Sequence, residues 1–211
     1  MRAILPFMLL LSIALLSGCT TDDNNAASSE KQAIEQAPTP FAQGAIALDI
    51  QTDPNLNAVH GIANSCTLLV IQASKSSTLN NLLNSPPRLR TLFSDAGGGD
   101  DILKVDRYSA MPGQRITLHI DRSQNSRYVA IVAGYYPFPQ QQHRLLVAIP
   151  VISESDGWWN KTWHARLQPL YLRLRLGSDS ISQFEGAKPL PLVSNTSNTL
   201  PDTPVRPAGG A

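Results

Sequence analysis

Apolar and polar residues alternate with a period of two through much of the chain between residues 44 and 185, the pattern of half-buried strands. The runs at residues 67–73, 128–136 and 145–152 are apolar on both faces, as is typical of central strands. Residues 79–83 switch to helical spacing, and Pro86-Pro87 follows them. Seven or eight strands separated by turn signals, with one inserted helical segment, predict an antiparallel β-sandwich.

The N-terminus has the pattern of an export signal. Arg2 precedes an apolar run over residues 3–16 that is too short to span a bilayer, so residues 1–18 are predicted to be a signal peptide. The sequence LSGC at 16–19 is typical of a bacterial lipobox, in which the cysteine sulfur, here Cys19, takes a diacylglycerol. Thr20 follows where lipoproteins retained in the inner membrane usually carry Asp, which favours the outer membrane.

Two polar segments flank the predicted sandwich domain at 44–185. Residues 19–43 are poor in aromatic residues and are expected to form a lipidated N-terminus and flexible tether, and residues 186–211, rich in Pro, Ser and Asn, a disordered tail. The net charge of +1 suggests neither nucleic acid nor an anionic surface as a partner. With Cys19 lipidated, Cys66 is the remaining thiol, and we expect it to be buried rather than reactive or in an intermolecular bridge.

The chain shows no convincing catalytic or metal-binding set. His119, Asp121 and Ser123 are triad residue types, but at alternate positions of one strand they point side by side toward solvent. The spacing of the four histidines matches no pattern of metal ligands, so we expect no metal. Since no catalytic set is left either, we expect no enzyme activity and no cofactor. The tryptophan-rich segment at 157–163 could be a carbohydrate platform, but packing at the rim of the core is the simpler interpretation.

The stretch between the first two strands, TDPNLNAVHGIANS at 52–65, is longer than an ordinary hairpin connection. It mixes amide and apolar side chains, so it is either a partner-binding loop or a decorative one. We expect it to be peripheral, so that shortening it would spare the core, with Leu56 or Val59 as an apolar anchor. The candidate partner-binding residues are Asp53, Pro54, Asn55, Leu56, Asn57, Val59, His60 and Asn64.

The order of several weak motifs resembles a known family. After the lipobox come AIALDIQTDPNLNAV, a helix with Leu82-Leu83, LKVDRYSAMPGQRITLHID and RYVAIVAGYYPFP. This succession, over residues 44–152 and more loosely to 176, is similar to the type VI secretion lipoproteins, the TssJ (VasD or SciN) family. The segment at 157–163 and the C-terminal tail have no counterpart in that pattern. The resemblance implies a transthyretin-like sandwich of two four-stranded sheets.

It also implies a function. Members of the family are outer-membrane lipoproteins whose domain faces the periplasm and holds the periplasmic C-terminal region of an inner-membrane TssM-like component, with the first long loop as a contact element. Two alternatives stay open: a periplasm-facing lipoprotein that carries a ligand, which would need a roomy cavity, and a pilot-type assembly lipoprotein of another secretion system. A lipid-anchored enzyme is the weakest hypothesis, and no small-molecule substrate is expected.

Overall fold

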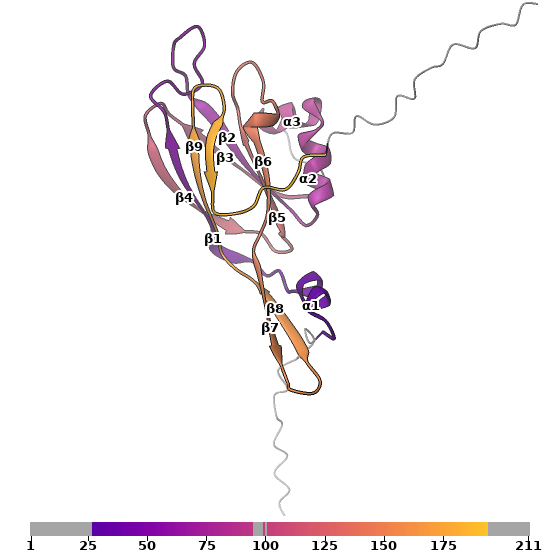
Figure 1. Ribbon diagram of the computed structural model, residues 1–211. Helices are drawn as coiled ribbons and strands as arrows, with labels where there is room; N and C mark the ends of the chain where they lie inside the picture. Colours follow the sequence, from indigo (N-terminus) through magenta and orange to yellow (C-terminus); the bar gives the residue numbers. More distant parts are fainter. Residues whose placement is uncertain (1–26, 95–98, 100, 194–211) are drawn as a thin grey trace, which may run out of the picture.

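The computed structural model describes residues 27–94, 99 and 101–193, so Cys19 and the predicted signal peptide lie outside the described residues. Two four-stranded sheets pack face to face, with helices on one side and a separate hairpin at one end (Figure 1). The predicted β-rich sandwich with two four-stranded sheets is therefore confirmed.

The first sheet has the order β10-β9-β1-β4 and the second β3-β2-β5-β6. The strands of the first sheet are β1 (Ala42–Thr52), β4 (Arg115–Arg122), β9 (Leu170–Leu176) and β10 (Ile181–Glu185). The strands of the second sheet are β2 (Cys66–Ala73), β3 (Ile102–Ala110), β5 (Tyr128–Ala133) and β6 (Arg144–Ala148).

The apolar halves of the alternating strands meet between the sheets and form the main core. Leu48 of β1 lies opposite Leu118 of β4 on one side and Leu172 of β9 on the other. The β1–β4 pair is antiparallel, but β1 and β9 run parallel. The sequence pattern predicted a purely antiparallel sandwich, and this part of the prediction is wrong. Alternation reports which face of a strand is buried and carries no information on its direction.

The inserted helical segment consists of α2 (Ser76–Leu83) and α3 (Pro86–Phe93), which cover the outer face of the second sheet. Leu79, Leu82 and Leu83 of α2 are buried together with Leu69 and Ile71 of β2 in a second apolar cluster. The second sheet is thus buried on both faces, which explains why its central strands carry apolar residues on both faces.

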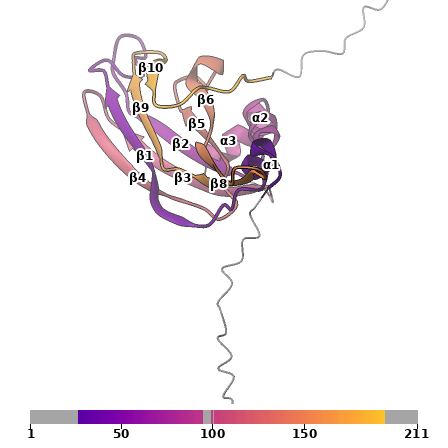
Figure 2. The ribbon, with the colours of Figure 1, turned by 60° about the horizontal axis from the view of Figure 1, so that its bottom comes forward.

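A hairpin of β7 (Val151–Asp156) and β8 (Thr162–Leu167) projects from the lower end of the sandwich (Figures 1 and 2). The single strand expected over residues 145–152 is divided at Pro150, which has no N–H to continue the ladder. The rim packing expected for the tryptophans is wrong for Trp158 and Trp159, which are highly exposed at the hairpin tip.

Part of the expected tether is ordered as helix α1 (Glu30–Gln36), which packs on the hairpin. Ala33 is buried there, and Ala27 pairs with Trp163 of β8. The Arg127 guanidinium donates hydrogen bonds to the carbonyls of Ile34, Glu35 and Ala37 at the C-terminal end of α1. The helix therefore owes its order to these partners, which the local composition of the segment does not reveal.

The first part of the expected tail also follows the sandwich. The Leu190 N–H donates to the Leu146 carbonyl at 2.7 Å, and Leu190 and Leu192 pack against the apolar cluster beneath α2 and α3. Residues 186–193 are therefore attached to the folded domain, unlike the disordered tail expected from residue 186 onward.

Candidate functional site: the loops at one end of the sandwich

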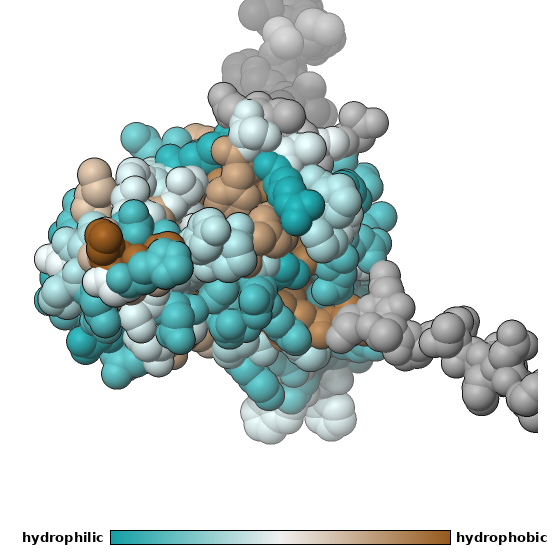
Figure 3. Space-filling model, turned by 90° about the horizontal axis from the view of Figure 1, so that it is seen from above, coloured by the Kyte–Doolittle hydropathy of each residue, from teal (hydrophilic) through white to brown (hydrophobic). Residues whose placement is uncertain are grey.

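Four connections gather at the end of the sandwich opposite α1 and the hairpin (Figure 1). They are residues 53–65, 111–114, 134–143 and 177–180, and we call this end the loop pole. Seen from above, it is a mixed surface in which hydrophobic patches lie among hydrophilic side chains (Figure 3). Such a surface suits protein recognition, because apolar contacts and polar pairing can alternate across it.

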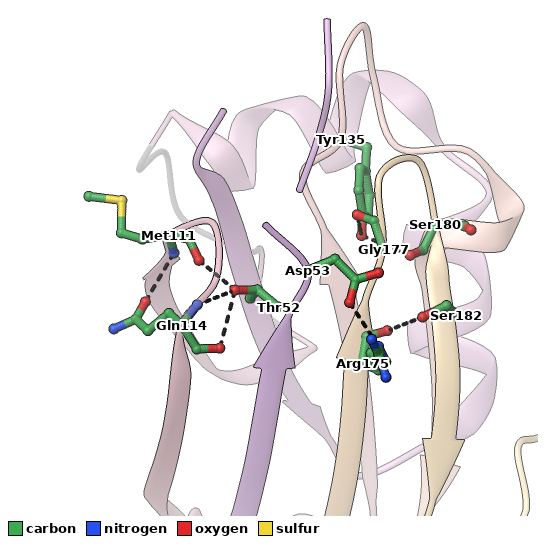
Figure 4. A network of polar contacts seen from close by, with 9 residues as sticks. All are labelled: Thr52, Asp53, Met111, Gln114, Tyr135, Arg175, Gly177, Ser180 and Ser182. Atoms are coloured by element: carbon green, nitrogen blue, oxygen red, sulfur yellow. Dashed lines mark hydrogen bonds and ion pairs between the residues drawn. The ribbon is translucent and has the colours of Figure 1, made fainter. Parts of the chain in front are cut away.

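Thr52, the last residue of β1, ties the long loop to the β3–β4 turn (Figure 4). Its hydroxyl donates to the Met111 carbonyl at 2.6 Å and accepts from the Gln114 N–H at 2.8 Å. The Gln114 side chain in turn accepts from the Met111 N–H. Gly113 closes the turn with a φ of 68°, which favours glycine. The loop thus starts from a fixed point.

Asp53 attaches the same loop to β9 on the other side. Its carboxylate accepts from Arg175 Nε at 2.8 Å, and its N–H donates to the Leu176 carbonyl. The hydroxyl of Tyr135 donates to the Ser180 carbonyl in the neighbouring β9–β10 turn (Figure 4). Each of the three neighbouring loops is hydrogen-bonded to the long one, through Gly113, Tyr136 and Ser178, and Tyr135 joins two of them to each other.

His143, at the end of the 3-10 turn η1 (Gln141–His143), is buried in this assembly. Its Nδ1 accepts from the Gln140 N–H, so Nε2 carries the proton and donates to the Asp179 carbonyl at 2.6 Å. Burial lowers the pKa of His143 below its usual value and raises the pKa of the hydroxyl of Tyr135, whose ring packs against His143. Both groups are neutral supports of the loops.

The lower half of the long loop belongs to the fold. Leu56 is fully buried in the main core, so it supports the loop from below and is not an exposed anchor. Asn57 is buried as well: its Nδ2 donates to the Ser65 carbonyl at 2.9 Å, and its Oδ1 accepts from the Tyr136 N–H at 2.8 Å. The expectation that this loop could be shortened without affecting the core is therefore wrong.

The upper half is a short two-residue turn. Val59 and Ile62 exchange both backbone hydrogen bonds, and His60 and Gly61 between them have φ values of 52° and 79°. Two positive φ angles are the signature of a type I′ turn, a compact and well-defined conformation. The Ile62 side chain at its end is 69% exposed, an unusual position for an isoleucine without a partner.

The predicted contact residues therefore fall into two groups. Four of them are buried or half-buried and hold the loop: Asp53, Leu56, Asn57 and Val59. The others are exposed on the loop pole: Pro54, Asn55, His60 and Asn64.

Three exposed apolar residues of the loop pole were not among the predicted contacts: Ile62, Met111 and Tyr136. Met111 borders the loop through Thr52, and Tyr136 is joined to it through Asn57. A signal for Tyr136 exists in the sequence, since strand alternation places only one of Tyr135 and Tyr136 inside. Met111 and Ile62 lie in turns, where no period indicates which side chain faces out.

Within residues 27–94, 99 and 101–193, no cluster of three His, Cys, Asp or Glu side chains could hold a metal ion. Burial raises the pKa of the Cys66 thiol to about 12, far from the thiolate that a nucleophile requires. In the same part of the chain, no helix has the length and apolar character to cross a bilayer.

Comparison with known proteins identifies the family. Residues 44–175 match the model of a family described as type VI secretion lipoprotein, VasD, EvfM, TssJ. The chain belongs to this family. The match covers most of the sandwich and three of the four loops of the loop pole, and it ends before the 177–180 turn and β10. The family expected from the sequence motifs is confirmed. The type VI secretion lipoproteins are membrane-associated structural components, and this chain is one of them.

Solved structures of low sequence identity are similar to the chain. The type VI lipoprotein TssJ1 from Pseudomonas aeruginosa is 20% identical, with a TM-score of 0.48, and covers 73% of this chain and 100% of its own. Serratia marcescens Lip, a membrane-bound type VI component, is 17% identical, with a TM-score of 0.45, covering 70% and 98%. A structure described as the TssM C-terminal domain from EAEC is 14% identical, with a TM-score of 0.45, covering 69% and 97%. A search of the curated proteins found no match.

Proposed function

We propose that this type VI secretion lipoprotein is anchored in the outer membrane through a lipid on Cys19 and faces the periplasm. Its loop pole binds the periplasmic C-terminal region of an inner-membrane TssM-like component. The lipoprotein thereby links the two membranes within the secretion complex.

The observation that carries this proposal is the opposite placement of two features. Ala27, where the described chain begins, pairs with Trp163 of the hairpin at the lower end of the molecule, and the loop pole lies at the upper end (Figure 1). A domain held from its N-terminal side by an acylated Cys19 would present the loop pole away from the membrane that anchors it. That is the direction from which an inner-membrane partner would approach.

The loop pole also has the features of a recognition surface. Ile62, Met111 and Tyr136 are exposed there on loops held by backbone and side-chain hydrogen bonds. A preformed surface loses less conformational entropy on binding than a mobile one. A ligand carrier is less well supported, because buried side chains from both sheets fill the interior where a ligand would lie.

The test is titration calorimetry of the periplasmic C-terminal domain of the TssM-like partner against point variants. Ile62→Ser and Tyr136→Ser each remove an exposed apolar side chain from the loop pole. The matched control is Tyr171→Ser on the outer face of β9, since Tyr171 is 66% exposed and Tyr136 is 67% exposed.

We expect each loop-pole variant to weaken binding at least tenfold, about 1.4 kcal/mol, and the control to bind like the wild type. Circular dichroism and urea unfolding verify that all three variants are folded. Unchanged affinity in both folded loop-pole variants would contradict the proposed interface. A loss confined to Tyr171→Ser would move the interface to the outer face of the first sheet.

A further inference from the structure

The tip of the β7–β8 hairpin carries two adjacent tryptophans that contact almost nothing. Trp158 and Trp159 are 91% and 92% exposed, the highest values among the exposed large apolar residues. The turn beneath them has a defined shape: Gly157 has a φ of 93°, and a Cβ there would lie 2.4 Å from the Asn160 carbonyl oxygen. Both indoles are therefore exposed on a turn of defined shape, and a pair of adjacent exposed tryptophans is unusual on a soluble surface.

The support behind the tip is braced. Ala27 adds to β8 beside Trp163, exchanging backbone hydrogen bonds of 2.9 Å in both directions. Helix α1 packs across both strands, burying Ala33 and Ala165 between them. Arg127 of the sandwich then holds the carbonyl end of α1. The tryptophan pair is therefore presented on a supported extension of the domain rather than on a loose loop.

The position of the tip along the chain indicates what it meets. Trp163, the partner of Ala27, is four positions from Trp159, so the two lie at most roughly 13 Å apart along the backbone. Residues 20–26, which join Cys19 to Ala27, can reach at most roughly 25–30 Å. An acyl anchor at Cys19 would consequently keep the hairpin tip within reach of the surface in which the acyl chains are inserted.

We propose that Trp158 and Trp159 insert into the phospholipid interface of the membrane that holds the Cys19 anchor. Tryptophan favours this zone because the indole ring is apolar and its N–H donates to headgroups. The neighbouring Asn160 and Lys161 are exposed polar side chains that can remain at headgroup level. The tip is a second membrane contact, which fixes the orientation of the domain where acyl chains alone would leave it free to rotate. This inference rests on the lipid anchor of the proposed function.

Fluorescence can test the contact directly, because the chain has three tryptophans and all of them lie in the hairpin segment. The acylated full chain is reconstituted into vesicles of phosphatidylethanolamine and phosphatidylglycerol, with and without brominated acyl chains. Trp163→Phe leaves only the tip pair as a reporter. Trp158→Ser with Trp159→Ser leaves only the half-buried Trp163 as an internal control.

We expect the tryptophan emission of the Trp163→Phe variant to lie at shorter wavelength on vesicles than for the same domain in buffer after proteolysis has cut it from its acyl anchor. Brominated lipid should quench the emission of the vesicle-bound variant. The double serine variant should still float with the vesicles, held by its acyl chains, and should show little quenching. Floating protein with unquenched, unshifted tip tryptophans would overturn the inference and leave the anchor intact. Failure to float would remove the anchor and both proposals with it. A shift produced by the partner's soluble domain in the absence of vesicles would show that the tip binds protein instead.

Discussion

Asn57 bridges the long loop and the loop after β5, and its replacement by alanine tests this bridge. Two hydrogen bonds would be lost, to the Ser65 carbonyl and from the Tyr136 N–H, each worth about 1 kcal/mol. Asn57 also has a φ of 47°, and alanine in this left-handed region costs roughly 1 kcal/mol more. We therefore predict that Asn57→Ala lowers the free energy of unfolding by about 3 kcal/mol, by adding these three contributions.

Urea unfolding followed by circular dichroism measures this loss, and Asn57→Gly separates its two causes. Glycine also lacks both hydrogen bonds, but it adopts a positive φ without strain. The free energy of unfolding of Asn57→Gly should therefore be about 1 kcal/mol higher than that of Asn57→Ala. An alanine variant within about 0.5 kcal/mol of the wild type would refute the bridging role of Asn57. If Asn57→Gly were as unstable as Asn57→Ala, the contribution assigned to the positive φ would be refuted, and the contribution of the two hydrogen bonds would stand.

Three further predictions concern single side chains. Cys19→Ser should leave the domain folded but absent from outer-membrane fractions, and its persistence there without secretion partners would contradict the lipid anchor. The free energy of unfolding should fall as pH drops below about 6.5, because the pKa of His143 is lowered in the folded protein and the unfolded chain therefore binds the proton first. His143→Gln should reduce this dependence of stability on pH. An equally steep dependence in that variant would assign the titration to another group. Cys66, buried with a pKa of about 12, should resist thiol reagents in the native protein and react after unfolding, so rapid native labelling would show that the site opens.

The sequence predicts the sheets well because alternation is a local property. In β9 the residues Leu170, Leu172, Leu174 and Leu176 are all buried, as their spacing indicates. The parallel pairing of β9 with β1 could not be predicted in the same way, because the direction of a strand depends on the path of the chain before it. That path includes the β7–β8 hairpin, which leaves the sandwich at Pro150.

The order in residues 27–43 was missed for a related reason. Judged by composition, this stretch buries too little apolar surface to fold alone. In the structure it is stabilised by Trp163 and Arg127, which lie far along the chain. The length and composition of the loop at 52–65 single it out as a candidate site, which stays a prediction, but its apolar residues Leu56 and Ile62 could not be told apart from the sequence. One is fully buried and the other is 69% exposed, and a loop has no period to distinguish them.

The parallel pairing of β1 and β9 also constrains the order in which the molecule can fold. β1 ends at Thr52 and β9 begins at Leu170, so these neighbours in the sheet are separated by most of the domain. Contacts between such distant segments form slowly, because a large loop must close before they stabilise anything. Until β9 arrives, one edge of β1 has unpaired N–H and C=O groups and can add to another chain. This edge of β1 is covered only when β9 closes the first sheet, and the same strand brings Arg175 to its partner Asp53.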